Sequence, residues 1–153
     1  MERIDEVRMG AWRAFLEAQA RVLEALGREL EREHSITLSE YEVLLYLFEA
    51  RAGSVRMQDL ADRALLSKSG ITRLVDRLER DGLVMRRSCP SDRRGVEAAM
   101  TDLGRAVFRK AGRTHLRGIA EHFTSHLSNA EAEAFVRAMG KVVAAATEGR
   151  RSA

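Results

Sequence analysis

The chain has 153 residues, a length that fits one domain or one domain with an attached oligomerisation element. Hydrophobic residues make up 45% of it and charged residues 32%, and no apolar run approaches the roughly 20 residues of a membrane-spanning helix. Together with a polar N-terminus and a single cysteine, this composition excludes a membrane protein and a disulfide scaffold, and it predicts a helix-rich protein of the cytoplasm.

Positive charge is concentrated in the middle of the chain, although the net charge is only +3. Residues 1 to 62 carry 8 basic and 13 acidic side chains, whereas residues 63 to 94 carry 9 basic and 4 acidic ones. Such a basic segment is the footprint expected of a surface that binds nucleic acid.

The first segment, from about Ile4 to His34, reads as one long helix without proline. Its apolar residues recur at spacings of three or four and are Val7, Ala11, Phe15, Ala18, Val22 and Leu26. At about 1.5 Å per residue this helix is on the order of 40 Å long, more than a domain of this size can cover. We therefore expect it to pack against a second copy of the chain.

A second helix is predicted to open at Ser39, whose side chain would form a capping box with Glu42. It ends at Gly53, and residues 54–56 form a short extended segment. An apolar helix from Met57 to Ala64 and a turn at residues 65–66 then lead into the next helix, as in a helix-turn-helix.

The helix after Ser67 has one apolar and one basic face. Ser67 is a good N-cap, and Ile71, Leu74, Val75 and Leu78 recur at helical spacing. The opposite face is polar and carries Lys68, Ser69, Thr72, Arg73, Asp76, Arg77 and Arg80. Short hydrogen-bonding side chains beside long cations at a helix N-terminus suit the major groove of DNA.

A β-hairpin with a basic tip is predicted to follow this helix. Gly82 ends the helix, residues 83–85 and 96–100 form two strands, and the loop of residues 86–95 carries four arginines and the only proline. A basic hairpin beside a helix-turn-helix is a wing.

Long helices are expected again after the wing. Thr101 can cap one that starts at Asp102, and Ser128 can form a capping box with Glu131 at the start of the last one. The predicted fold is therefore mainly α, a winged helix-turn-helix with a small antiparallel wing and long N- and C-terminal dimerisation helices. Its predicted divisions are a helical dimerisation region of residues 1–34 and 102–147, a DNA-binding region of residues 35–101 and a frayed tail of residues 148–153.

The segment LSKSGITRLVDRLERDGLVMRR and the wing sequence PSDRRGVEAAMTDLGR resemble those of the MarR family of dimeric winged helix-turn-helix transcription regulators. The resemblance runs from about residue 4 to residue 147. It implies that Asp92 orients Arg94, which enters the minor groove, and that the protein represses genes until a small molecule releases it. This chain departs from the family at Met100, where leucine is frequent, a change that an apolar strand end tolerates.

The resulting hypothesis is a homodimer that reads an inverted repeat in double-stranded DNA, because two recognition helices would meet major grooves about 34 Å apart. Lys68, Ser69, Thr72 and Arg73 would read or approach bases, and Arg77 would hold a phosphate. Arg93 and Arg94 would serve the wing, since arginine suits the negative potential of a narrow minor groove.

A small anionic or phenolic effector is implied by the resemblance. Trp12, Tyr41 and Arg86 are candidates for its pocket, with Arg86 facing the anionic group. Each also has a structural interpretation: Trp12 in a subunit interface, Tyr41 in the core and Arg86 on a DNA phosphate.

Two other sensing modes remain open. His122 and His126 have the i, i+4 spacing of metal sites, with His115 on the same helix face, although exposed histidines explain the pattern equally well. Cys89 lies between Arg87 and Arg93, which would favour a reactive thiolate.

No catalytic constellation is found, so an enzyme is not expected, nor is a cofactor. A helical protein–protein adaptor is the remaining alternative, and steep salt dependence of DNA binding would distinguish it.

Overall fold

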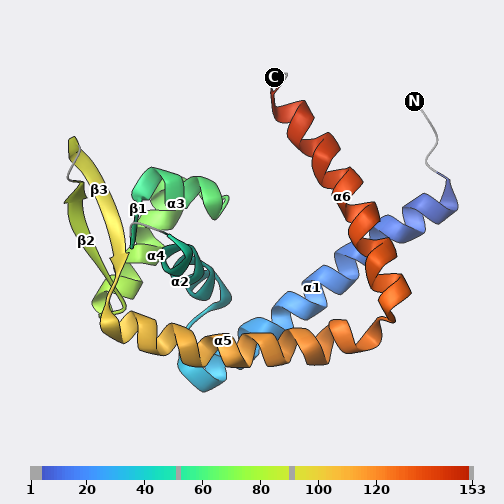
Figure 1. Cartoon of the computed structure of the whole chain (residues 1–153), viewed down its shortest axis with the longest axis horizontal. Coiled ribbons are helices and arrows are strands. Elements are labelled where there is room, and N and C mark those ends of the chain that lie inside the picture. The colour runs from blue at the N-terminus through green and yellow to red at the C-terminus, as the bar shows by residue number, and fades with distance from the viewer. Residues whose placement is uncertain (1–4, 51–52, 90–91, 152–153) are drawn as a thin grey trace.

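The molecule consists of a small winged head and an arm of long helices that projects from it (Figure 1). The computed structural model describes the backbone of residues 5–50, 53–89 and 92–151, and their side chains except at residues 89, 92–94 and 149–151. The elements, in chain order, are α1 (Glu6–His34), α2 (Leu38–Glu49), β1 (Ser54–Arg56), α3 (Met57–Arg63), α4 (Lys68–Arg80), β2 (Val84–Cys89), β3 (Asp92–Met100), α5 (Asp102–His122), the 3-10 turn η1 (Thr124–His126) and α6 (Asn129–Arg151).

The head is built around α2. Its side chains Tyr41, Val43, Leu44 and Leu47 are buried with residues of α4, the sheet and α5 in one core. The three strands form an antiparallel sheet in the order β1-β3-β2, so the segment of residues 54–56 pairs with the wing as predicted. The predicted mainly helical fold with a small antiparallel wing is confirmed.

The wing strands are longer than the sequence predicted. Arg86 and Arg87 belong to β2 and not to the hairpin loop, because pairing continues past Met85. Arg87 stands directly opposite Glu97 on β3, and an oppositely charged cross-strand pair stabilises such a ladder.

Side-chain caps fix most of the helix starts that the sequence indicated. Ser67 Oγ accepts the amide of Gly70 at 3.1 Å, and Ser128 and Glu131 form their reciprocal box. The predicted start of α2 is wrong by two residues, because the capping box is formed by Thr37 and Glu40 and not by Ser39 and Glu42. Burial of Ile36 explains the difference, since it holds the preceding chain against the core.

A close contact joins the base of the wing to α5. Thr101 Oγ1 donates to Gly82 O at 2.7 Å and accepts the amide of Gly104 at 2.9 Å. A Cβ atom at residue 104 would lie 2.0 Å from Leu83 O, so only glycine fits there. The threonine-x-x-glycine motif is thus a structural joint between wing and arm.

The arm is formed by α1, α5 and α6. Helix α1 packs along α5, where Thr114 Oγ1 donates to Glu33 Oε2 at 2.9 Å. Because that hydroxyl proton is committed to the carboxylate, His34 Nε2 donates to Thr114 Oγ1, at 2.8 Å. Helix α6 continues to Arg151, so the frayed tail predicted from residue 148 is helical up to that residue; residues 152 and 153 lie outside the described part.

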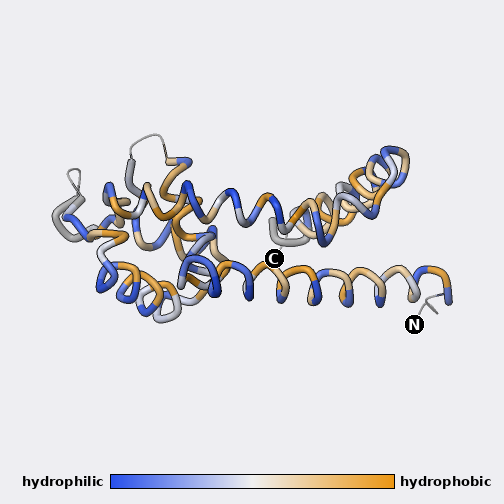
Figure 2. Tube along the Cα trace, turned by 90° about the horizontal axis from the view of Figure 1, so that it is seen from below, coloured by the Kyte–Doolittle hydropathy of each residue, from blue (hydrophilic) through white to orange (hydrophobic). Residues whose placement is uncertain are grey.

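Hydrophobic residues recur along the helices of the arm (Figure 2), and several of their side chains are exposed. Val7 is 82% exposed, Trp12 55% and Val142 61%. Between α1 and α6 runs a groove of about 620 Å³ whose lining is almost wholly apolar and includes Phe15, Val22, Phe135 and Met139. None of the described helices is long and apolar enough to cross a membrane.

Candidate nucleic-acid interface

The outer face of α4 carries the predicted base-reading side chains. Lys68, Ser69, Thr72 and Arg73 are all exposed, whereas Ile71, Leu74, Val75 and Leu78 are buried against the head. This confirms the predicted orientation of the helix; contact of these residues with bases stays a prediction. Thr72 Oγ1 donates to Lys68 O at 2.7 Å, and Arg73 Nε donates to Ser69 O at 3.3 Å.

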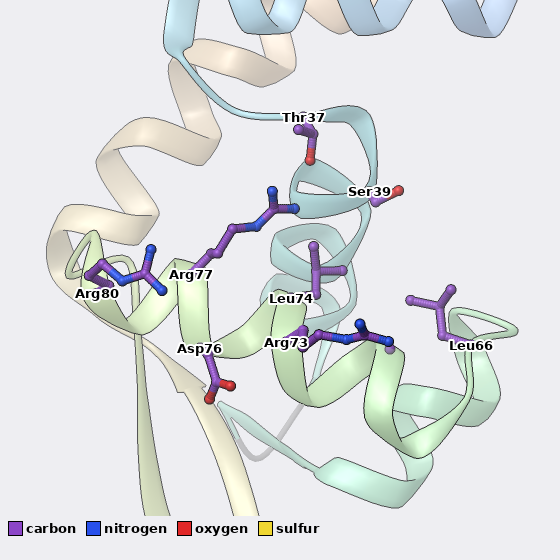
Figure 3. Close-up of a pocket in the computed structure, with 9 residues that line it drawn as sticks. Thr37, Ser39, Leu66, Arg73, Leu74, Asp76, Arg77 and Arg80 are labelled. Carbon is purple, nitrogen blue, oxygen red and sulfur yellow. The ribbon is translucent and has the colours of Figure 1, made fainter.

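Three arginines of α4 face a concave surface beside the start of α2 (Figure 3). Arg73, Arg77 and Arg80 line a cavity of about 650 Å³, together with Thr37 and Ser39 of α2. Arg77 forms an ion pair with Glu40, with 3.1 Å between Nε and Oε1. Glu40 itself is almost fully buried, with 7% of its side chain exposed.

Arg86 ties the wing to α4. Its guanidinium lies 2.7 Å from Asp76 Oδ1 and 2.6 Å from Glu79 Oε2, and it also donates to Thr72 O at 3.2 Å. The backbone amide of Arg86 donates to Glu79 Oε1 at 2.9 Å. These hydrogen bonds from the Arg86 backbone and guanidinium lower the pKa of Glu79. The Arg86 side chain therefore holds β2 against α4. This role differs from the effector contact and the DNA-phosphate contact that the sequence suggested.

A second polar network joins all three strands. Ser54 Oγ on β1 donates to Glu97 Oε2 on β3 at 2.8 Å, and Arg87 of β2 contacts both of them. The two networks brace β2 from both sides, against α4 and against β1.

The tip of the wing lies largely outside the described side chains. The backbone of Asp92, Arg93 and Arg94 belongs to β3, but their side chains and that of Cys89 are not described. The predicted contact of Asp92 with Arg94, the groove contacts of Arg93 and Arg94 and the reactivity of Cys89 therefore stay predictions.

The three candidates for an effector pocket have separate surroundings. Trp12 stacks on Phe15 near the start of α1, with 6.1 Å between ring centroids. Tyr41 is buried in the head, 5.4 Å from the ring of Phe108 and 4.5 Å from that of His115. Arg86 pairs with α4, as above, and the described contacts bring no two of these candidates together.

The predicted histidine pair does not converge either. His122 Nε2 lies 2.7 Å from Glu29 Oε1 on α1, whereas His126 Nε2 contacts the backbone oxygen of Glu121. The ligand atoms of Glu29, Glu121 and His122 lie within 4.8 Å of one another, a different set from the pair in the sequence. Glu29 Oε2 is buried and has no hydrogen-bond partner among the described residues.

Sequence reasoning missed the acidic partners of the basic residues: Glu40, Glu79 and Glu97. Only Glu40 had a local signal in the sequence. Thr37 stands three residues before it, which indicates a capping box but not the ion pair with Arg77. Glu79 and Glu97 pair with side chains 7 and 10 residues away, through strand register and helix packing.

Comparison with known proteins gives consistent matches. The model of the MarR family matches residues 36–96. An uncharacterized HTH-type transcriptional regulator of Bacillus subtilis, YkoM, is 33% identical over 116 residues, which cover 76% of this chain and 73% of YkoM. The HTH-type transcriptional repressor YetL of the same bacterium is 31% identical over 101 residues, which cover 66% of this chain and 60% of YetL.

Solved structures match over nearly the whole chain. AbsC, a MarR family transcriptional regulator from Streptomyces coelicolor, has a TM-score of 0.88 at 30% identity, covering 97% of this chain and 99% of AbsC. Sco3205, a MarR family regulator from the same organism in complex with DNA, has a TM-score of 0.86 at 28% identity, covering 97% of this chain and 91% of Sco3205. The similarity therefore includes the arm as well as the winged head.

Proposed function

The chain belongs to the MarR family of DNA-binding transcriptional regulators, and from that premise we propose that it is a homodimeric repressor of an inverted-repeat operator. The observation that carries the proposal is the exposed polar face of α4, which stands beside a wing that Arg86 fixes to the same helix. A recognition helix and a wing held in one rigid unit can enter adjacent grooves of one DNA site.

Dimerisation is proposed from the unburied apolar surface of the arm. Val7, Trp12 and Val142 are more than half exposed, and the apolar groove between α1 and α6 has no cover within the described chain. Apolar surface of this extent on long helices is typical of a subunit interface. A second arm related by a two-fold axis would cover it and would place two heads on one face of DNA.

The experiment begins with selection of bound sequences from a random pool, followed by a fluorescence-anisotropy titration at fixed salt. Arg73→Ala is expected to weaken operator binding by about 1–3 kcal/mol and to relax its sequence preference. The reason is that the substitution removes the guanidinium group from the exposed face of α4. Arg94→Ala should weaken binding through the wing. Lys141→Ala is the matched control, since it removes an exposed cation from α6.

Release by an effector is tested in the same titration. Salicylate-like anions added at fixed salt should weaken operator binding if a small phenolic ligand releases the repressor, as the family resemblance implies.

The metal-responsive alternative is tested by measuring operator binding after dialysis against a chelator and again after zinc is added. The cluster of Glu29, Glu121 and His122 favours this alternative. Binding that is only weak and independent of DNA sequence would instead identify an adaptor.

A further inference from the structure

Glu40 is a buried carboxylate with two distinct partners. Its Oε2 accepts the backbone amide of Thr37 at 2.7 Å, which completes the capping box at the start of α2. Its Oε1 lies 3.1 Å from Nε of Arg77 on α4. Because only 7% of the side chain is exposed, the negative charge depends on these partners for its stability.

The ion pair holds part of an arginine side chain that is half exposed. The Arg77 side chain is 50% exposed, and the ion pair with Glu40 is formed through its Nε. An exposed arginine ordinarily samples many rotamers and loses that freedom when it binds. Here the ion pair with Glu40 already holds the guanidinium of Arg77 beside the start of α2, at the lining of the cavity, before any ligand arrives.

That place is the cavity between α2 and α4, which suits an anion. Arg73 and Arg80 line the same cavity of about 650 Å³ from the turns before and after Arg77 (Figure 3). The one carboxylate in the lining, Asp76, is already paired with Arg86 at 2.7 Å. Two amides at the nearby start of α2 are consumed by the capping box, so the arginines supply the positive charge.

We propose that this cavity seats a phosphate of the DNA backbone and that Glu40 is the positioning residue that holds Arg77 for it. The proposal rests on the proposed function, and it adds the start of α2 to the DNA-binding surface. Glu40 does not touch DNA; it acts through Arg77 alone.

The test is a double-mutant cycle on operator affinity, measured as a function of salt. Glu40→Gln keeps a side-chain oxygen for the Thr37 amide and removes the charge that holds Arg77. We expect affinity to fall on the order of 10-fold, equally for all operator sequences, and the slope of log K against log salt to decrease by about 1. Arg77→Ala should do the same, and Glu40→Gln should have no further effect when Arg77 is already alanine.

The chain supplies a matched control in its second capping box. Glu131 accepts the Ser128 amide at 2.8 Å at the start of α6, and no arginine among the described side chains forms an ion pair with it. Glu131→Gln should therefore leave both affinity and salt slope unchanged. Circular dichroism of each variant verifies folding, and Arg77→Ala, an exposed position, serves if Glu40→Gln does not fold.

Two outcomes would overturn the positioning role while leaving the repressor intact. One is wild-type affinity and salt slope in folded Glu40→Gln. The other is a loss that adds fully to that of Arg77→Ala, which would show that Glu40 acts through the stability of α2. If Arg77→Ala itself has the wild-type slope, the cavity seats no phosphate. A wild-type chain without salt-dependent DNA binding would overturn the proposed function as well.

Discussion

His115 lies where α5 meets the head, with its ring 4.5 Å from that of Tyr41 and its Nδ1 buried without a hydrogen-bond partner among the described residues. Burial disfavours the charged imidazolium and lowers the pKa of His115 below its ordinary value of 6.5. The sequence placed this histidine on one helix face with His122 and His126, but α5 ends at His122, His126 lies in η1, and the three have different environments. Helical spacing defines a face, whereas the neighbours of that face come from the rest of the fold.

This environment predicts a dependence of stability on pH. Because the folded state binds the proton less readily than the unfolded chain, His115 stabilises the fold fully above pH 6.5, and this contribution decreases as the pH falls below that value. We expect the melting temperature to fall between pH 7.5 and 5.5, and to fall less in His115→Phe. The carboxyl groups of Glu33, Glu79 and Glu131 also have lowered pKa values. They change the pH dependence of stability only below about pH 4.5, outside this window.

Thermal unfolding followed by circular dichroism at several pH values measures the effect. His126→Ala is the control, because His126 is exposed and its ring lies against the backbone oxygen of Glu121. A pH dependence in His115→Phe that equals the wild-type dependence would contradict the assignment.

At the level of elements, the wing and α4 form a unit because Arg86 bridges them. Asp76 and Glu79 stand one turn apart on α4, and the guanidinium of Arg86 contacts both. Arg86→Lys is expected to lower the free energy of unfolding by about 1–3 kcal/mol, a value between those of exposed and buried ion pairs. The reason is that an ammonium group cannot contact Asp76 and Glu79 and also donate to Thr72 O.

Hydrogen exchange of the β2 amides provides the measurement for Arg86→Lys. Exchange should accelerate in β2 and operator affinity should fall, while amides of α6 keep their wild-type rates. Lys110→Ala on the exposed side of α5 is the control substitution. Unchanged exchange in β2 would show that the Arg87 network alone holds the strand.

Elements were predictable where the signal is local. Ser67, Thr101 and Ser128 cap helices as expected, because a cap depends on residues within one turn. The start of α2 offered two capping boxes two residues apart, and burial of Ile36 selected the first. Contacts across long separations, such as that of His122 with Glu29, 93 residues apart, were beyond the sequence because they depend on how α1 and α5 pack.

At the scale of the whole molecule, the exposed apolar side of the arm predicts the oligomeric state. Val142→Glu places a charge on α6 at a position that is 61% exposed in the single chain, so its effect on the stability of one chain should be small. In a dimer the same charge would be buried without a partner, and we expect dissociation to monomers at micromolar concentration with loss of high-affinity operator binding.

Sedimentation equilibrium and the anisotropy titration measure these two effects. Met85→Glu is the control for sedimentation alone, because Met85 is 51% exposed and lies away from the arm, on strand β2 of the wing. A wild-type chain that sediments as a monomer, or a Val142→Glu variant that remains a dimer, would rule out this interface.

The joint at Gly104 also makes α5 a lever. The helix has 21 residues and is therefore about 30 Å long; its first turn is locked to the base of the wing, and its other half to α1 through Thr114 and His122. If the arm end tilts by about 10°, the wing end moves by about 5 Å, more than the roughly 3.4 Å between successive base pairs. A tilt of this size at the arm would thus shift the head by more than one base-pair step relative to its DNA site.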